Sequence, residues 1–397
     1  MQDKGSNLIE TRRRNRALLK NLIFRTPDAT RTQMAEILHL TKPTITTSVN
    51  EMLQEGILEE IPLPEDKLKQ TSGRHPSSIA FRADAGLAIG VELGPYTTEA
   101  VLMDLKGNIR TAVSEQPPNV SYDIMLEQLC AMIRMLLPKD TGHLLGAGIG
   151  LPGFINNEQG LIRKTPRARW SGYPLAADLE ARLGIPVMID NNVRLRALEQ
   201  VMNLQNAGSD TFAYFYISKG VACPLMVGGQ VLSGHSYGSG ELGHALMASD
   251  STTGTFLSVD DLASERALME RCQQDLLKGD APELREILNK YGKFDLDNLL
   301  ELERKQVPAI TRNFKETLHY AGIALANVVN LINPELVIVD AYMMQEPMNR
   351  DYLLEAAHKN FYGLNEEEVK VCFVPFDQSR GAKGAAYYVI LKKFLEV

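Results

Sequence analysis

The sequence is poor in the residues that mark secreted and metal-bound small domains. It has four cysteines in 397 residues, and none lies close to another: Cys130, Cys223, Cys272 and Cys372. This spacing excludes a dense disulfide framework and a Cys-x-x-Cys metal or redox motif, and it fits a reducing compartment.

Long apolar runs are also missing. Seven Lys and Arg residues interrupt the first 25 positions, which leaves no apolar core for a signal peptide, and no later stretch is long and apolar enough to span a bilayer. We therefore predict a cytoplasmic protein without a membrane partner. With 44% hydrophobic and 23% charged residues, the chain is too apolar to be disordered and long enough for two or three domains.

Charge is distributed unevenly along the chain. The net charge is −7, yet residues 1–50 hold nine Lys/Arg against four Asp/Glu, which is about +5. A basic N-terminal part on an acidic remainder predicts a polyanion partner for the N-terminal part alone.

Residues 1–62, called the head below, have the pattern of a helix-turn-helix. Thr32 is expected to cap one short helix, and Thr41 to precede a second with Pro43 in its first turn, where proline is tolerated. The second helix buries one apolar face and leaves a small, polar face outside, as a helix entering the major groove requires. A helical hairpin with a solvated face is the alternative. The short helices, the tight turn, the strand expected after Gly56 and the upstream arginines together favour a winged helix-turn-helix.

The residues expected to bind DNA fall into two groups. Arginines of the first helix are assigned to phosphates, and side chains of the second short helix to the major groove. The assigned residues are Arg12, Arg13, Arg16, Lys42, Thr44, Thr47 and Asn50. Residues 63–82 are predicted to form the wing and a linker. Within them, Arg74 either contacts DNA or is a solvated linker residue.

The rest of the chain predicts an α/β body of two lobes, 83–192 and 193–397, with a C-terminal helix that returns to the first lobe. Each lobe begins with a strand hairpin; in the second, strands at 211–217 and 224–227 are expected with Gly228-Gly229 as the turn. Lobes of this kind hold ligand in the cleft between them.

Several motifs, in order along nearly the whole chain, resemble the ROK family of repressors and sugar kinases. The matching segments are RRRNRALLKNLI, the helix-turn-helix run, GRHP at 73–76, GIGLPGFI at 148–155, IPVMIDNNVR at 185–194, GSGELGH at 238–244 and NVVNLINPELVIVD at 327–340. The resemblance implies an actin-like or hexokinase-like body behind the winged helix-turn-helix.

The resemblance also implies a catalytic site that has decayed. Where related kinases use the aspartate of an Asn-Asp pair as general base, this chain has Asn191-Asn192, and an amide has no useful basicity. The first phosphate loop, Asp-x-Gly-x-Thr in the family, is Glu92-Leu-Gly94-Pro95-Tyr96 here. The phosphate turn of the second half is replaced by residues 218–223, and the late Gly-Gly by 340–342. We expect no enzyme activity, no catalytic residue and no cofactor.

Zinc and sugar need separate predictions. Residues 245–265 contain no cysteine, so His244 lacks the zinc-binding loop of its relatives and no metal is expected. Positions that the resemblance assigns to sugar hydroxyls remain: Asn191, Asn192, Glu241, His244 and Asp260. The alternative is that Glu241 and His244 only stabilise a glycine-rich turn.

We predict a DNA-binding transcription regulator of carbohydrate-metabolism genes that acts as a repressor. Its expected partners are double-stranded operator DNA and a sugar or sugar-phosphate effector in the cleft, and the chain is expected to form a homodimer or tetramer. Two alternatives are an active sugar kinase with an accessory head, and a regulator whose body is a ligand-free dimerisation scaffold.

Overall fold

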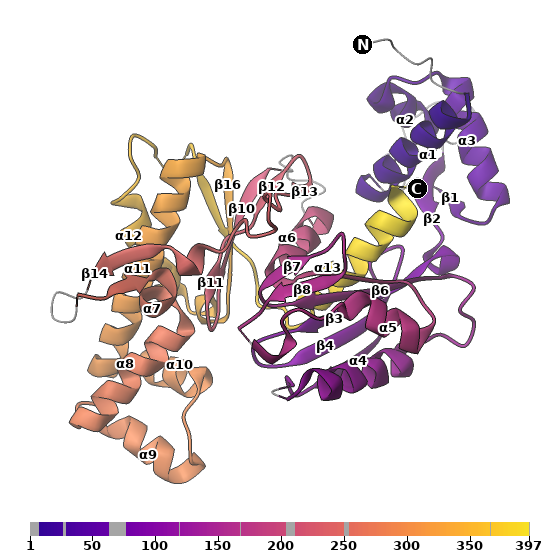
Figure 1. Cartoon of the computed structure of the whole chain (residues 1–397). Coiled ribbons are helices and arrows are strands. Elements are labelled where there is room, and N and C mark those ends of the chain that lie inside the picture. The colour runs from indigo at the N-terminus through magenta and orange to yellow at the C-terminus, as the bar shows by residue number, and fades with distance from the viewer. Residues whose placement is uncertain are drawn as a thin grey trace. The chain divides into compact units, whose positions relative to one another are not determined.

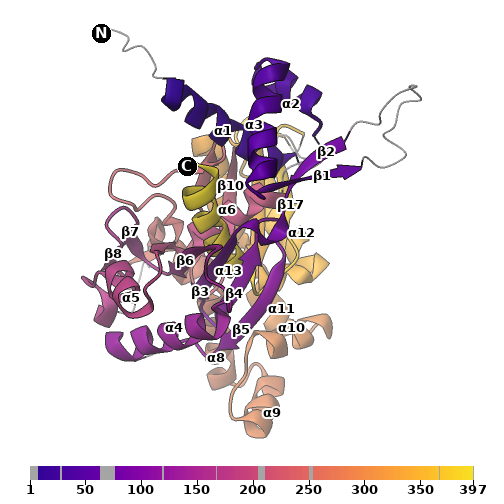
Figure 2. The same ribbon diagram turned by 90° about the vertical axis from the view of Figure 1, so that its right-hand side faces the viewer.

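The computed structural model describes the chain except for residues 1–7, 27–28, 63–76, 119, 167, 204–210, 250–253, 366 and 397. Two compact units are present, Met1–Ala207 together with Ser379–Val397, and Gly208–Gln378. Figure 1 shows their elements, and Figure 2 gives the same ribbon from the side. No helix in the described part of the chain is long and apolar enough to cross a membrane.

The head is three helices followed by a two-stranded hairpin. Its elements are α1 (Leu8–Arg25), α2 (Arg31–Leu38), α3 (Lys42–Gln54), β1 (Leu58–Pro62) and β2 (Ser77–Phe81), with β1 and β2 antiparallel. Ile45, Val49 and Met52 of α3 are buried, as the helix period predicts. The order of helices and hairpin is that of a winged helix-turn-helix.

Local capping sets the two short helices, and one expectation was wrong. Thr30, not Thr32, caps α2, because Thr30 and Gln33 form a reciprocal capping box. Thr41 caps α3 by accepting from the amide of Thr44, and Pro43 lies in the first turn, as predicted. His39 ends α2 with a left-handed backbone (φ 52°), which forms the tight turn between the helices.

The body part of the first unit is a five-stranded sheet in the order β5-β4-β3-β6-β9. The strands are β3 (Leu87–Leu93), β4 (Thr98–Asp104), β5 (Ile109–Glu115), β6 (Leu144–Leu151) and β9 (Val187–Asn191). Helices α4 (Tyr122–Leu136) and α5 (Leu175–Leu183) pack on one face through the apolar core. A short hairpin, β7 (Phe154–Asn156) with β8 (Leu161–Lys164), follows β6.

Small residues let a helix lie directly on the other face of this sheet. Helix α13 (Arg380–Ile390) packs on β3 and β6 beside α6 (Asn192–Asn203). A Cβ at Gly90 would lie 1.9 Å from the carbonyl oxygen of Ala382, and one at Gly148 2.1 Å from that of Ala385. Because α6 packs on α13, the first unit extends to Ala207, past the lobe boundary expected at 192, and the C-terminal helix belongs to it.

The second unit is built on a six-stranded sheet. Its strands are β10 (Phe212–Ile217), β11 (Val221–Ala222), β12 (Leu225–Val227), β13 (Gln230–Val231), β16 (Leu336–Ala341) and β17 (Lys370–Phe373). They follow the order β13-β12-β10-β16-β17, with β11 also paired to β10. Gly228-Gly229 is a turn, but it joins β12 to β13 rather than β10 to β12.

Helices and a small hairpin complete the second unit. They are β14 (Leu246–Ser249), β15 (Phe256–Ser258), α7 (Val259–Ala263), α8 (Glu265–Lys278), α9 (Pro282–Tyr291), α10 (Leu296–Arg304), α11 (Pro308–Ile332) and α12 (Pro347–His358). Their apolar faces and the strands share one core.

Candidate functional site

The outward face of α3 carries most of the side chains expected to read DNA. Lys42, Thr47 and Asn50 are exposed, while the opposite face of the helix is buried in the head. Thr46 is exposed on the same helix and was not singled out from the sequence. A helix with small polar side chains outside can enter a major groove.

Thr44, one of the residues expected to lie in the major groove, contributes to the cap of α3. Its hydroxyl lies 2.9 Å from that of Thr41, and its amide donates to the Thr41 hydroxyl, so the side chain belongs to the cap of α3. Arg74 lies outside the described residues.

Two of the arginines assigned to phosphates form ion pairs inside the head. Arg12 pairs with Glu51, and Arg16 forms a two-point ion pair with Glu55, one contact measuring 2.8 Å. The arginines are one turn apart on α1, and the glutamates are one turn apart at the C-terminal end of α3, where Glu55 is the C-cap, so the pairs tie the two helices together. The Glu55 hydrogen bond raises the pKa of Arg16, and the Arg16 hydrogen bond lowers the pKa of Glu55.

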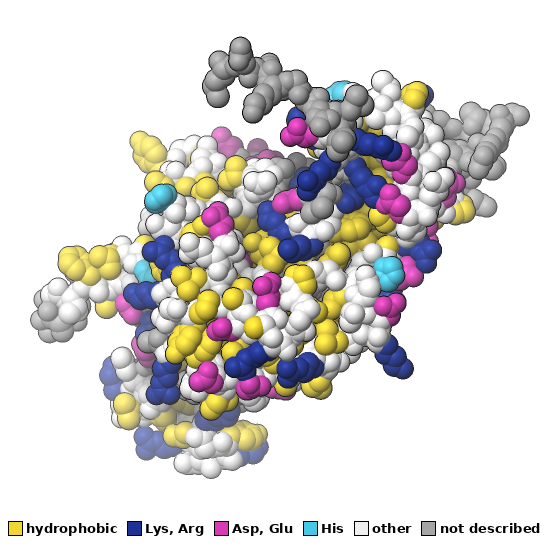
Figure 3. Space-filling model, turned by 45° about the vertical axis from the view of Figure 1, so that its right-hand side comes forward, with side chains coloured by type: hydrophobic (Ala, Val, Ile, Leu, Met, Phe, Trp, Pro, Cys, Tyr) yellow, Lys and Arg dark blue, Asp and Glu magenta, His cyan; other side chains and the backbone are white. Residues whose placement is uncertain are grey.

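Arg13 lies beside these pairs without sharing them. It is exposed, lines the same groove as Arg12 and Arg16, and has no ion pair among the residues that the structure describes. Figure 3 shows Lys and Arg side chains close together on this face of the head. Arg31, a residue the sequence analysis missed, adds a cation next to α3: it donates to Glu60 at 2.5 Å and lies 3.4 Å from Asn50.

The C-terminal segment contacts the head within the first unit. After α13, Leu391–Leu395 continues as a turn of π-helix whose carbonyls accept from α1: Lys20 donates to Phe394 at 2.8 Å and Asn21 to Leu395 at 3.2 Å. Burial lowers the pKa of Lys20 to about 8. The rings of Phe24 and Tyr387 stack at 5.2 Å.

Asn191 and Asn192 lie where β9 passes into α6. The Asn191 side chain accepts from the amides of Val193 and Arg194, so it caps α6, and it donates to the Gly153 carbonyl at 3.0 Å. Asn192 is buried, and its amide nitrogen lies 3.3 Å from a carboxylate oxygen of Glu92. Neither amide can act as a general base.

Glu92 lies at the centre of this region. From the sequence it was interpreted only as a residue that replaces the aspartate of the first phosphate loop. Its carboxylate, 1% exposed, accepts from both the Nε and Nη2 of Arg196 at 2.6 and 2.8 Å. A second buried pair joins Arg194, two residues earlier on α6, to Asp190 at the end of β9. Arg196 is four residues after Asn192, and that helical spacing was the signal available in the sequence.

The predicted ligand residues of the second unit lie around one turn. Glu241 is half-buried and occupies the N-cap position of the short 3-10 helix Leu242–His244, and His244, the last residue of that helix, is exposed. Asp260 accepts from the Val221 amide at 2.7 Å, so its carboxylate holds the hairpin between β10 and β11. This contact gives Asp260 a structural role whether or not it also binds ligand.

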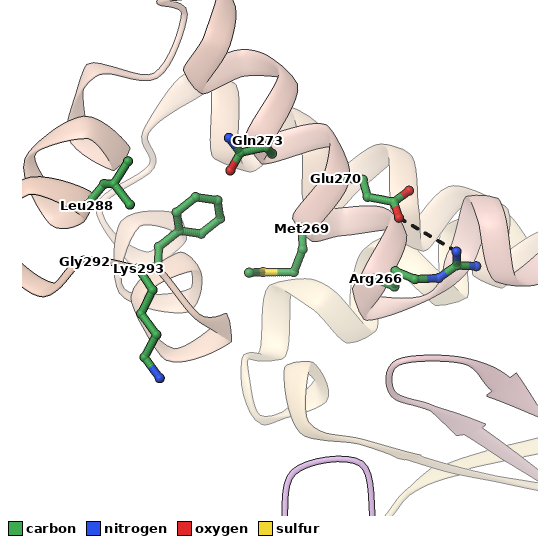
Figure 4. A pocket seen from close by; sticks show the side chains of 8 residues that line it. Arg266, Met269, Glu270, Gln273, Leu288, Gly292 and Lys293 are labelled. Carbon is green, nitrogen blue, oxygen red and sulfur yellow. Dashed lines mark ion pairs between the residues drawn. The ribbon is translucent and has the colours of Figure 1, made fainter. Parts of the chain in front are cut away.

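A pocket in the second unit is lined by none of the predicted residues. Its volume is about 440 Å³, and it lies among α8, α9 and the residues that follow α9. In Figure 4 the Met269 side chain points into it while Arg266 and Glu270 pair at one side. Among the described residues no cluster of three or more His, Cys, Asp or Glu is placed to hold a metal ion.

Comparison with known proteins assigns the chain to a family. The ROK family model matches residues 88–392. A xylose repressor of Bacillus subtilis (strain 168) is 26% identical over 329 residues, which cover 82% of this chain and 81% of that protein.

Two solved structures share the fold. A ROK family transcriptional regulator, a homolog of the E. coli MLC protein, has a TM-score of 0.77 at 19% identity and covers 97% of both chains. A ROK family glucokinase from Streptomyces griseus, in complex with glucose and AMPPNP, has a TM-score of 0.66 at 22% identity and covers 76% of this chain and 99% of its own. The predicted fold class, an α/β hexokinase-like body behind a winged helix-turn-helix, is confirmed.

Proposed function

Because the chain belongs to the ROK family, we propose that it is a sugar-responsive transcription repressor that binds double-stranded operator DNA through its head. The observation that carries this proposal is the head itself: a capped, amphipathic α3 presents Lys42, Thr47 and Asn50 outward. The likeness to xylose repressors over 82% of the chain supports repression controlled by a sugar.

The body is a regulatory module rather than an enzyme. The position of the kinase base is an amide, Asn192, whose nitrogen donates to Glu92. A group without basicity cannot take the proton of a sugar hydroxyl.

On DNA, Lys42, Thr47 and Asn50 lie in the major groove and Arg13 contacts phosphate. Arg12 and Arg16 hold α1 against α3 through their glutamates. A homodimer in the cytoplasm, with two heads about one helical turn of DNA apart, provides the symmetry that a palindromic operator requires.

The side chains proposed to bind hydroxyls of the effector are Asn191 and Asn192 in the first unit and Glu241, His244 and Asp260 in the second. Amides, carboxylates and an imidazole each exchange hydrogen bonds with a polyol. Effector binding shifts operator affinity by the difference between its affinities for the DNA-bound and the released state.

Selection from a random duplex pool with the full chain tests the proposal. The expected result is one enriched, two-fold-symmetric sequence that a member of a pentose and hexose panel releases. A Thr47→Ala/Asn50→Ala variant should lose the sequence preference, with roughly 1–3 kcal/mol lost for each good base contact, and keep non-specific binding.

Two results would contradict the proposal. One is selection that enriches no sequence. The other is sugar-dependent ATP consumption in a coupled assay, which would show that the chain is an active sugar kinase.

A further inference from the structure

Glu303 is a carboxyl group in the interior of the second unit. It lies on α10, where 0% of its surface is exposed, and it forms no ion pair among the described residues. The leucines around it on the same helix are buried in the core of the unit: Leu299, Leu300 and Leu302. An ionised carboxylate in such a place has lost its hydration and needs a compensating charge.

The amide of Asn349, on α12, contacts this carboxyl group from one side. Asn349 is also 0% exposed, and its nitrogen donates to Oε2 of Glu303 at 3.0 Å and to the Met343 carbonyl at 2.9 Å. Because the nitrogen faces two acceptors, the orientation of the amide is fixed. The other two oxygens, Oε1 of Glu303 and Oδ1 of Asn349, are buried and have no hydrogen-bond partner in the described part of the chain. One acceptor on each group therefore lacks a donor.

The nearby charged groups do not supply that donor. Arg304 on α10 and Glu346 at the N-cap of α12 act on Glu303 with opposite signs, and they form an ion pair with each other at 2.6 Å. Arg350 on α12 donates to the Met344 carbonyl instead. Burial raises the pKa of Glu303 to about 7.

Asp275 is a buried carboxylate of the same unit whose charge is compensated. It is 6% exposed and accepts from the Asn313 amide at 2.8 Å, as Glu303 accepts from Asn349. Unlike Glu303, it also accepts from a guanidinium, that of Arg312, at 2.8 Å. Glu303 has no such second donor, and a proton is the smallest group that can take its place.

We propose that Glu303 is protonated in the folded chain at mildly acid pH and pairs with Asn349 through two hydrogen bonds, which makes this pair a proton-sensitive lock between α10 and α12. The O–H on Oε1 of Glu303 donates to Oδ1 of Asn349 while the Asn349 amide donates to Oε2. One proton thus satisfies both buried oxygens and removes the charge.

Loss of the proton opens the lock. A buried carboxylate then faces the amide oxygen of Asn349, and two acceptors cannot form a hydrogen bond. Asn349 also holds the Met343 carbonyl of the short helix Tyr342–Gln345, which follows β16, so this segment should loosen together with α10 and α12 as the pH rises.

Infrared spectra of the full chain test the protonation directly, because a neutral carboxyl group and a carboxylate absorb at separate frequencies. At about pH 6, where ordinary carboxyl groups are ionised, the unaltered chain should show the carbonyl band of a protonated carboxyl group, and the band should be lost by about pH 8.5. Glu303→Gln should lack the band, and Asp275→Asn, the matched control, should keep it. A spectrum of the unaltered chain without the band at about pH 6 overturns the proposal, and so does a band that remains in Glu303→Gln.

Thermal melts in sodium, potassium and choline chloride separate a proton from a bound monovalent cation. With a proton on Glu303, the melting temperature of the unaltered chain at mildly acid pH should be the same in the three salts. A melting temperature that depends on the cation in the unaltered chain but not in Glu303→Gln overturns the proposal.

Hydrogen exchange reads the lock itself. The amide of Glu303→Gln can form the same two-point pair with Asn349 at every pH, so at about pH 6 its exchange over α10 and residues 342–353 should match that of the unaltered chain. At about pH 8.5 these segments should exchange at least tenfold faster in the unaltered chain than in the variant, since the comparison at equal pH removes the intrinsic pH dependence of exchange. Equal exchange at both pH values overturns the lock.

Discussion

Replacing Arg13 by glutamine should weaken binding to any DNA duplex and make that binding less sensitive to salt. Arg13 is exposed beside α3 and is not held by an ion pair among the described residues, so its charge is available to a phosphate. Removing both members of the neighbouring pair, in Arg16→Gln/Glu55→Gln, should leave the salt dependence unchanged, because that pair carries no net charge.

The size of the effect follows from counterion release. Each phosphate contact contributes about −0.9 to the slope of log affinity against log salt concentration, which is roughly a 3.5-fold loss of affinity between 50 and 200 mM salt. Arg13→Gln should therefore make the slope shallower by about 0.9. The Arg16/Glu55 pair is partly exposed, so its loss should cost at most about 1 kcal/mol of stability.

Fluorescence anisotropy with a labelled random-sequence duplex measures both slopes, since non-specific binding needs no known operator. Arg266→Gln removes an equal charge from the second unit and serves as the control for net charge. An equal loss of slope in Arg13→Gln and Arg266→Gln, or a loss in the Arg16/Glu55 variant, would refute the assignment.

Three further outcomes are expected. Phe394→Ala removes a buried ring 5.3 Å from that of Phe81 and should lower the stability of the head by about 3 kcal/mol, seen as earlier proteolysis of the head than of the body. Gly148→Ala should destabilise the first unit by about 3 kcal/mol or more in urea unfolding, because its Cβ meets a helix carbonyl. Burial raises the pKa of Glu303 to about 7. The folded chain therefore keeps a proton that the unfolded chain loses above about pH 4.5, and stability falls by about 1.4 kcal/mol per pH unit up to pH 7. The difference in stability between the unaltered chain and Glu303→Gln should change over this range; a constant difference would contradict the pKa.

Patterns with a short period were predictable from the sequence. Ile45, Val49 and Met52 repeat at the helical period and are buried, and Pro43 lies in the first turn of its helix as expected. The loss of the kinase base was equally visible, because it depends on the chemistry of one residue, Asn192. Thr30 rather than Thr32 caps α2 because the Gln33 side chain completes its capping box, a choice between nearby threonines that composition does not settle.

The fold class, the helix-turn-helix pattern and the amide at the position of the kinase base could be predicted from the sequence, since they depend on local periods and on single side chains. The tertiary structure decided the partners of the charged groups. Arg16 meets Glu55, 39 residues away, and Glu92 meets Arg196, 104 residues away. Such pairings depend on how α1 packs on α3 and how α6 packs on the sheet. The periodicity of the sequence does not predict which residues so far apart in the chain will meet.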